Sequence, residues 1–555
     1  MRALLIAACA LAALPVLGVL LVWVDTDAAA LATLAHLADT VLAGYVAQSL
    51  LLALGVAAGV ALLGVGTAAA VALFRFPGRG FFEWALLLPM AMPAYVLAYA
   101  YTDALQASGP LQSALRDAFG WRGALWPDIR SLGGAVLLFV LCLYPYVYLL
   151  TRAALGERAV QLMEAARLLG AGRKRRLFTV ALPLARPAVA AGVALALMET
   201  LADYGVGSYF GLSTFTTGIY RAWLSMNDAA AAAQLASMLL ALVALLLWLE
   251  RRSQARLRFA SSRSGALHGD EAQPQALHGK AALAAFGFCA LPVVLGFVLP
   301  VGWLGAMLWR EVGGTVAGAL GGAVGGAVGD TAGAGAGLPL ARFAEWAWAS
   351  FRLAGIAAVA AVLLALALGF AQRRRDNWRD RTLALAARVI ALGYAVPGAV
   401  IAVGILLPLG YVQQRWPEAG AAALVTGTVV GVLYAYLVRF SAVALQSIEA
   451  GYARIGPAVD ETARLLGAGR KRLFMQLHLP LLKRSAFAAL LLVFVDVMKE
   501  LPATLVLRPF GSDTLAVVAY NLARDERLAE AALPSLAIVL VGLIPVLLLS
   551  RAMRR

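Results

Sequence analysis

Long apolar stretches alternate with short polar connections along the whole chain. Each stretch approaches the roughly 20 residues that a helix needs to cross a bilayer. Because a helix pairs its own backbone hydrogen bonds, the pattern predicts a helical bundle rather than a barrel. The expected spans, about twelve in number, are residues 3–24, 42–74, 82–104, 131–151, 183–205, 229–249, 281–303, 351–371, 385–409, 421–447, 481–503 and 532–550.

Composition supports an all-α polytopic membrane protein. Of the 555 residues, 62% are hydrophobic and only 14% are charged, and the mean hydropathy is +0.83, which is outside the usual range of soluble domains. The basic start at Arg2 would also suit a cleaved signal sequence. The apolar run to Val24 is long and has no evident cleavage site, so we expect an uncleaved span.

Basic residues indicate the orientation of the chain. Lys and Arg collect in the short cytoplasmic loops of membrane proteins, and this pattern predicts that both termini are cytoplasmic. It also accounts for the net charge of +16 without a nucleic-acid partner. The basic connections include residues 75–79, 173–176, 251–258, 373–381, 470–472 and 551–555.

The metal-binding residue types show no ligand pattern. Cys9, Cys142 and Cys289 all fall inside apolar stretches, where a role in packing is expected rather than a disulfide or a metal cluster. His268 and His278 lie in a polar linker, and no further ligands are spaced around them. We therefore expect that this chain binds no cofactor of its own.

Residues 313–337 are rich in glycine and alanine and almost uncharged. Their small-residue spacing could form a helix-packing face, but glycine at this density disfavours a helix. A span here would also move the later basic connections to the opposite side of the membrane. We therefore expect a flexible external loop over 313–340.

The chain contains an internal repeat. The phrase EAARLLGAGRKR begins at Glu164, and ETARLLGAGRKR begins at Glu461, so 11 of 12 positions are identical at an offset of 297. The segments after these phrases, 198–223 and 498–523, also match at an offset of 300. Both phrases occupy the same side, which predicts a parallel duplication: a first half over 1–250, a cytoplasmic linker over 251–280 and a second half over 281–555.

Each repeated phrase predicts a short helix with a defined end. The glutamate suits the positive N-terminal end of a helix, and Gly170 or Gly467 suits the left-handed position that follows the last turn. Small alanines leave one face thin enough for a partner surface. A basic loop that only fixes topology would explain the arginines, but not the matched glycine and Leu-Pro spacing in both halves.

These residues resemble the EAA loop of ATP-binding-cassette (ABC) importer permeases, and the two loops would cover 164–183 and 461–480. Thr462 departs from the pattern at one alanine, which leaves the helix plausible. The duplicated halves further resemble fused ferric-iron permeases across most of the chain. The pattern is filled by Glu164, Ala165, Ala166, Gly170, Val180, Leu182 and Pro183 in the first copy, and by Glu461, Ala463, Gly467, Leu477, Leu479 and Pro480 in the second.

The resemblance implies a type I ABC importer permease in a bacterial inner membrane. Each loop would be a coupling helix that docks on one of two cytoplasmic ATP-binding subunits, and a periplasmic or extracellular substrate-binding protein would deliver the cargo. ATP and magnesium would be used by those subunits, because this chain has no G-x-x-x-x-G-K-[ST] pattern.

The cargo and the mechanistic class have alternatives. Relatives that carry thiamine, sulfate, molybdate or polyamines share the loop, so the loop identifies the class of transporter better than the substrate. Hydropathy alone would also fit a transporter driven by an ion gradient, against which the two EAA loops argue. A membrane enzyme lacks support, because no nucleophile-base or metal pattern is present.

Ionisable residues near the spans are candidates for the substrate pathway, because burying a charge in lipid is costly. Glu199 aligns with Lys499 in the repeat, and Asp203 and Glu500 lie close by. Carboxylates suit a hard cation such as ferric iron. The alternative is that these groups lie at the headgroup level or form a structural pair.

Several prolines are expected to interrupt helices and free backbone carbonyls. Such breaks could line a cavity or only improve packing. The residues are Pro89, Pro93, Pro397 and Pro502.

Overall fold

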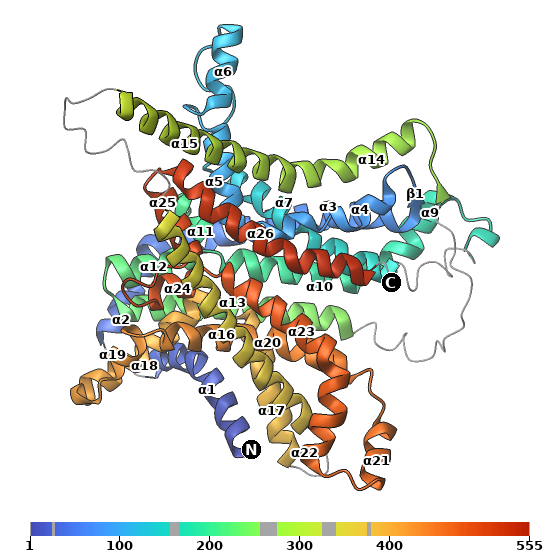
Figure 1. The fold of residues 1–555 in the computed structure, drawn as a ribbon, viewed down its shortest axis with the longest axis vertical. Coiled ribbons are helices and arrows are strands. Elements are labelled where there is room, and N and C mark those ends of the chain that lie inside the picture. Colours follow the sequence, from blue (N-terminus) through green and yellow to red (C-terminus); the bar gives the residue numbers. More distant parts are fainter. Residues whose placement is uncertain are drawn as a thin grey trace. The chain divides into compact units, whose positions relative to one another are not determined.

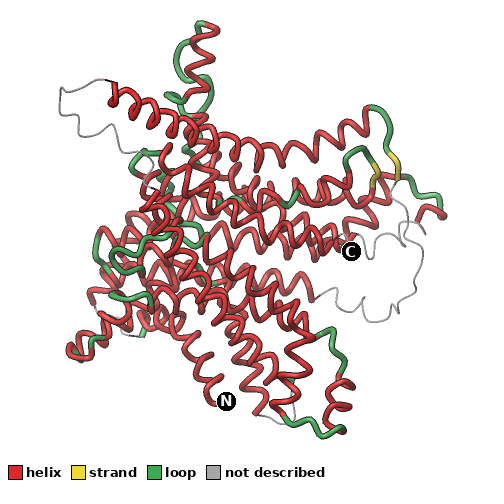
Figure 2. The backbone as a smooth tube through the Cα atoms, viewed as in Figure 1, coloured by secondary structure: helices red, strands yellow, loops and turns green. Residues whose placement is uncertain are grey.

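The computed structural model describes residues 2–24, 28–155, 166–255, 275–324, 340–373 and 379–553. Helices dominate these ranges (Figures 1 and 2). The only strands in the described part are β1 (Phe74–Arg75) and β2 (Gln275–Ala276), which pair in parallel. The predicted all-α fold is therefore confirmed.

Nine helical segments in the described ranges are long and apolar enough to cross a membrane, and two bent pairs of helices raise the number to eleven. The expected span over 481–503 falls on α23 (Leu479–Met498), which carries Lys483, Arg484 and Asp496 and is not among the eleven. The nine segments are Leu5–Trp23, Leu31–Leu73, Leu132–Ala154, Phe178–Ala202, Ala229–Arg252, Lys280–Val312, Leu340–Gln372, Val430–Tyr452 and Leu528–Leu548.

The two bent pairs correct the expected spans 82–104 and 385–409, which are not continuous helices. The first pair bends by 88° before α5 (Ala94–Leu105), and the second bends by 118° before α18 (Gly398–Arg415). Pro93 and Pro397 lie at these breaks with extended ψ angles of 141° and 143°. A proline ring clashes with the preceding helical turn, so each residue ends one helix and begins another.

Pro89 and Pro502, the other two prolines of the predicted set, also lie where helices are interrupted. Pro89 lies in the 3₁₀ turn η3 (Leu88–Ala91). Pro502 begins the short helix α24 (Pro502–Leu507), where its missing N–H costs nothing.

The described helices form two compact units. Unit 1 comprises residues 1–40, 218–240 and 339–518, and unit 2 comprises residues 41–217, 241–338 and 519–555. In unit 1, α16 (Leu340–Gln372), α20 (Val430–Tyr452) and α23 pack against one another, and α1 (Arg2–Leu20) packs on α17 (Arg379–Leu392) and α18.

Unit 2 repeats this core with helices from the other half of the sequence. Here α3 (Ala43–Leu73), α7 (Leu132–Ala154) and α10 (Leu182–Ala202) pack against one another. The unit also holds α14 (Lys280–Val293), α15 (Leu299–Val324) and α26 (Leu528–Met553). The first helix of the first sequence half, α1, therefore belongs to the unit whose core comes from the second half, and α14 belongs to the unit whose core comes from the first half. The sequence boundaries 1–250 and 281–555 stay a prediction.

Close packing of α3 on α7 depends on small residues. A Cβ atom at Gly59 would lie 2.3 Å from a methyl group of Val140, and one at Gly55 would lie 2.9 Å from a methyl group of Val136. Glycines four residues apart let two membrane helices approach to backbone contact, where dispersion replaces the absent hydrophobic effect.

The expected external loop over 313–340 is wrong in its first part. Helix α15 continues to Val324, so residues 313–324 are helical. Extending a long preformed helix needs no new nucleus, and the alanines offset part of the cost of about 1 kcal/mol for each glycine. Residues 325–339 lie outside the described ranges, and α16 begins at Leu340.

Candidate functional site

The second repeated phrase forms the end of a short surface helix, α21 (Pro457–Leu465). The helix begins four residues before Glu461, so the expected start at Glu461 is wrong. Pro457 favours this earlier start because its fixed φ suits the first helical position. Asp460, rather than Glu461, is the acidic residue of the first turn.

Both phrases end their helices in the same way. The amide of Gly467 donates to the carbonyl of Arg464 (2.9 Å), and the amide of Ala468 donates to that of Ala463 (3.0 Å). The first copy repeats these bonds from Gly170 and Ala171 at 3.0 and 2.9 Å. This is the Schellman pattern, and the φ angles of 79° at Gly170 and 81° at Gly467 confirm the expected left-handed glycines.

Each phrase exposes a pair of leucines just before its glycine. Leu465 and Leu466 are 89% and 80% exposed, and Leu168 and Leu169 are 89% and 87% exposed. Large apolar side chains that repeat at matched exposed positions indicate an interaction surface. We call the four residues the leucine pairs.

The other predicted loop residues lie on the surface around these pairs. Glu461 and Gly467 are exposed, and Ala463 is half-buried. In the first copy, Ala166 is half-buried and Gly170 is exposed. Glu164 and Ala165 lie outside the described residues.

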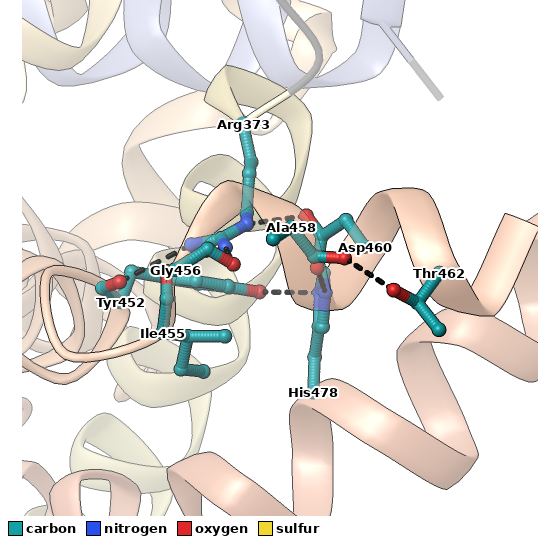
Figure 3. Close-up of polar contacts among 8 residues, drawn as sticks. All are labelled: Arg373, Tyr452, Ile455, Gly456, Ala458, Asp460, Thr462 and His478. Carbon is teal, nitrogen blue, oxygen red and sulfur yellow. Dashed lines mark hydrogen bonds and ion pairs between the residues drawn. The ribbon is translucent and has the colours of Figure 1, made fainter.

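A buried charged cluster anchors α21 to the neighbouring helices (Figure 3). The Arg373 Nε, directly after α16, donates to the Asp460 carboxylate. The Arg373 Nη atoms donate to three carbonyls at the end of α20 and in the turn that follows it: Tyr452 (3.1 Å), Ile455 (2.6 Å) and Gly456 (3.0 Å). One guanidinium thus holds the end of α20 and the turn that leads into α21.

His478 completes this cluster from the π-helical turn η11 (Leu473–His478). Its Nε2 donates to Asp460 Oδ1 over 2.8 Å, because an ionised carboxylate only accepts. The Tyr452 hydroxyl lies 3.4 Å from Nδ1, and the imidazole packs edge-on against the rings of Phe370 and Tyr452. We call Arg373, Asp460 and His478 the α21 anchor.

The anchor changes the acidity of Asp460. Burial favours the neutral form of this carboxyl, but hydrogen bonds from Arg373 and His478 and their charges outweigh burial and lower the pKa of Asp460 below its ordinary value. Asp460 is therefore an anion in the folded state at neutral pH.

Glu500, a predicted pathway residue, lies in a buried ion pair. Its Oε1 is 3.7 Å from Nη1 of Arg439 on α20, and both residues are less than 10% exposed. The carboxylate also accepts from the backbone amides of Ala503 (2.8 Å) and Thr504 (3.0 Å) at the start of α24. A Cβ atom on Gly398 would lie 2.8 Å from Glu500 Oε1, so the glycine after the Pro397 break makes room for this pair.

The other pathway candidates are half-buried. Asp203 Oδ1 accepts from the amide of Val206 (2.8 Å) at the start of α11 (Gly205–Tyr209). Glu199 lies in the last turn of α10, and Lys499 directly follows α23. Among the described residues, no group of three or more His, Cys, Asp or Glu side chains is arranged to hold a metal ion.

Sequence reasoning missed the partners of these carboxylates. Arg439 stood out as an arginine inside an apolar span, a signal that could have found it. The α21 anchor was harder to find, because its members are separated by 87 residues (Arg373 to Asp460) and 18 residues (Asp460 to His478).

The duplicated helical cores and the two matched surface loops define a polytopic membrane protein built from a repeated transport module. The sequence comparison agrees: the family described as binding-protein-dependent transport system inner membrane component matches residues 61–259 and again 357–555. The chain belongs to this family, and it holds two copies of the family's domain.

Relatives cover most of the chain or about a third of it. An Fe(3+)-transport system permease protein, FbpB 2, of Haemophilus influenzae is 26% identical over 86% of this chain and 84% of its own length. A ferric transport system permease protein of Actinobacillus pleuropneumoniae is 25% identical over 79% of this chain, which spans 61% of that relative. The molybdenum transport system permease protein ModB of Escherichia coli K12 is 32% identical over 33% of this chain and 81% of its own length.

Proposed function

We propose that the chain is the fused membrane subunit of an ATP-driven importer that moves ferric iron across the bacterial inner membrane. The observation that carries this proposal is the pair of matched loops, each ended by a left-handed glycine and each exposing two leucines. Two equivalent surfaces on one chain suit two copies of one partner, as a pair of ATPase subunits would provide.

The proposed mechanism is alternating access. A substrate-binding protein delivers the cargo at the external face, and both termini lie in the cytoplasm. The partner subunits bind and hydrolyse ATP, and their closure moves both loops, which rocks the helical cores. The chain supplies the pathway and the docking surfaces but no ATPase site or resident cofactor.

Iron as cargo is supported by the two ferric permeases that align with most of the chain. Molybdate is the second candidate, because the molybdenum permease aligns with 33% of the chain at the higher identity of 32%. The decisive test is uptake by the complex in proteoliposomes supplied with its binding protein. We expect radioactive ferric iron to accumulate and molybdate to remain outside, whereas the reverse would transfer the assignment to molybdate.

The docking proposal is tested by copurification with the ATPase partner. Replacing both leucine pairs by aspartate removes the apolar contacts and adds four charges, so we expect the partner to be lost. Glu164→Arg with Glu461→Arg is expected to weaken the same contact. A matched control is Leu111→Asp, because Leu111 is an exposed leucine (40%) on α6 (Pro110–Phe119) and belongs to neither loop. Full retention of the partner by the leucine-pair variant would contradict coupling through these loops.

Pathway roles for Glu199, Asp203, Lys499 and Glu500 are part of the proposal. Carboxylate oxygens suit ferric iron by ligand type, and Lys499 aligns with Glu199 in the repeat. Glu199→Gln and Lys499→Met are expected to lower the transport rate in a complex that assembles normally. A transport rate equal to that of the unmodified complex would remove these two residues from the pathway.

A further inference from the structure

The α21 anchor joins four elements at one guanidinium and one carboxylate. Arg373 extends from the end of α16, the three carbonyls lie at the end of α20 and just after it, Asp460 belongs to α21, and His478 leads into α23 (Figure 3). Arg373 and Asp460 are only 15% and 8% exposed at their side chains. Water therefore competes weakly for these bonds, and the helix cannot tilt without breaking several at once.

The first half has a different sequence at the corresponding positions. At the repeat offset of 297, Met163 stands where Asp460 stands, and Ala181 stands where His478 stands. Neither side chain can form a charged hydrogen bond. The first loop therefore cannot build the same anchor.

Charges in the described part of the first half form another network. Glu83 on α4 (Arg79–Ala85) lies 3.4 Å from Arg79 and 3.3 Å from Arg152 on α7. This network ties α4 to α7.

We propose that Arg373, Asp460 and His478 are positioning residues that fix the second coupling helix rigidly to α16, α20 and α23, and that the first loop, with Met163 and Ala181 at the matching positions, lacks this charged anchor. The two loops then transmit movement unequally: the second acts as a stiff lever, and the first adapts to its partner. This inference rests on the proposed function in one respect: the movement that the second loop transmits is that of an ATPase subunit.

The mobility of each loop can be measured on the full chain in lipid nanodiscs, without any partner. The three native cysteines are buried, so a spin label on Leu465→Cys or Leu168→Cys reports its own loop. We expect lower mobility at Leu465 than at Leu168. Asp460→Asn keeps the shape of the side chain but removes its charge, and it should raise the mobility at Leu465 while leaving Leu168 unchanged.

Two further variants separate anchoring from general damage. His478→Phe keeps the ring packing against Phe370 and Tyr452 but removes the donor to Asp460, and it should also mobilise Leu465. Thr426→Ala removes a local hydrogen bond to the Ala422 carbonyl on α19 (Ala421–Thr426), a helix of the same unit outside the loop, and should have no effect. An immobile label in both anchor variants, or equal mobilisation at Leu168, would overturn the proposal.

The functional consequence is tested in the assembled complex by counting substrate molecules moved per ATP hydrolysed. Asp460→Asn should lower this ratio about threefold or more while the ATPase partner stays bound, and Thr426→Ala should leave it unchanged. An unchanged ratio in a mobilised variant would refute the lever. If the unmodified chain bound no ATPase, the proposed function would fail, whereas the mobility result would stand.

Discussion

Single residues decide how each loop ends and which charges are buried. Gly170 and Gly467 both take the left-handed conformation that lets the last helical carbonyls find partners. The sequence predicted this pair, because glycine is the residue type that adopts this conformation without strain. The Arg439–Glu500 pair was not predicted. Arg439 carries a signal as an arginine inside an apolar span, but the sequence does not say which carboxylate it meets.

Gly467→Val should loosen the end of α21. A β-branched residue in the left-handed region costs about 1–2 kcal/mol, so the terminal amides of α21 should exchange with deuterium several-fold faster. Gly469→Val is the matched control, because Gly469 has an extended backbone with φ −69° and ψ 168°. Equal exchange in the two variants would contradict the role of the left-handed turn.

Arg439→Met should destabilise unit 1 by about 3–5 kcal/mol, because it leaves the Glu500 charge buried without its partner. Chemical unfolding in detergent measures this loss. The double variant Arg439→Met with Glu500→Gln removes both charges and should recover part of it. The control Arg508→Met breaks a more exposed pair, Arg508 with Asp513, and should lower the free energy of unfolding by about 1 kcal/mol or less. If Arg439→Met costs no more than this control, the Arg439–Glu500 pair does not stabilise the unit.

Elements follow sequence signals where the signal is local. Hydropathy located eleven of the twelve expected spans, with 481–503 the exception, and prolines located the two breaks. The bend angles of 88° and 118° required the structure, because packing decides where the second helix of each pair turns. The extension of α15 to Val324 was missed, since a neighbouring helix overrides the weak propensity of glycine.

The position of α21 should depend on pH only under acid conditions. Because the pKa of Asp460 is lowered in the folded state, its stabilisation is complete above the ordinary value of about 3.9 and is lost as the pH falls through the lower folded value. The groups that donate to the carboxylate are Arg373, directly after α16, and His478 from η11, and the hydroxyl of Tyr452 on α20 lies against His478. The carboxylate keeps these bonds while it is ionised, so milder acid should not release the helix.

The measurement is the mobility of a spin label at Leu465→Cys between pH 7 and pH 3. We expect a constant signal to about pH 4 and higher mobility below it. Asp460→Asn should give the mobile signal at every pH. Release of the unmodified helix near pH 6 would show that another group controls it.

The whole molecule exchanges helices between its sequence halves. Residues 1–40 belong to the unit of 339–518, and residues 241–338 and 519–555 belong to the unit of 41–217. Neither sequence half contains a complete unit. The duplication could be predicted from the sequence, but this exchange of helices could not. Repeated residues show that the two halves are related, and they do not show which helices pack together.

Cutting the chain between residues 260 and 261, in the linker, should therefore give two fragments that fold only together. Coexpressed fragments are expected to copurify and to unfold at nearly the temperature of the intact chain. Each fragment expressed alone lacks helices of both units, so it should be degraded or aggregate. A stable fragment of residues 1–260 on its own would contradict the exchanged arrangement.

The sequence by itself determined the membrane class, the duplication, the breaks at Pro93 and Pro397 and the glycine-ended loops. These features depend on residue type and spacing within a few turns of chain, where solvent and backbone sterics act locally. The tertiary structure alone decided which helices form each unit, and it brought Arg373, Asp460 and His478 together. Those contacts join residues far apart in the chain, and only packing against lipid and neighbouring helices selects them.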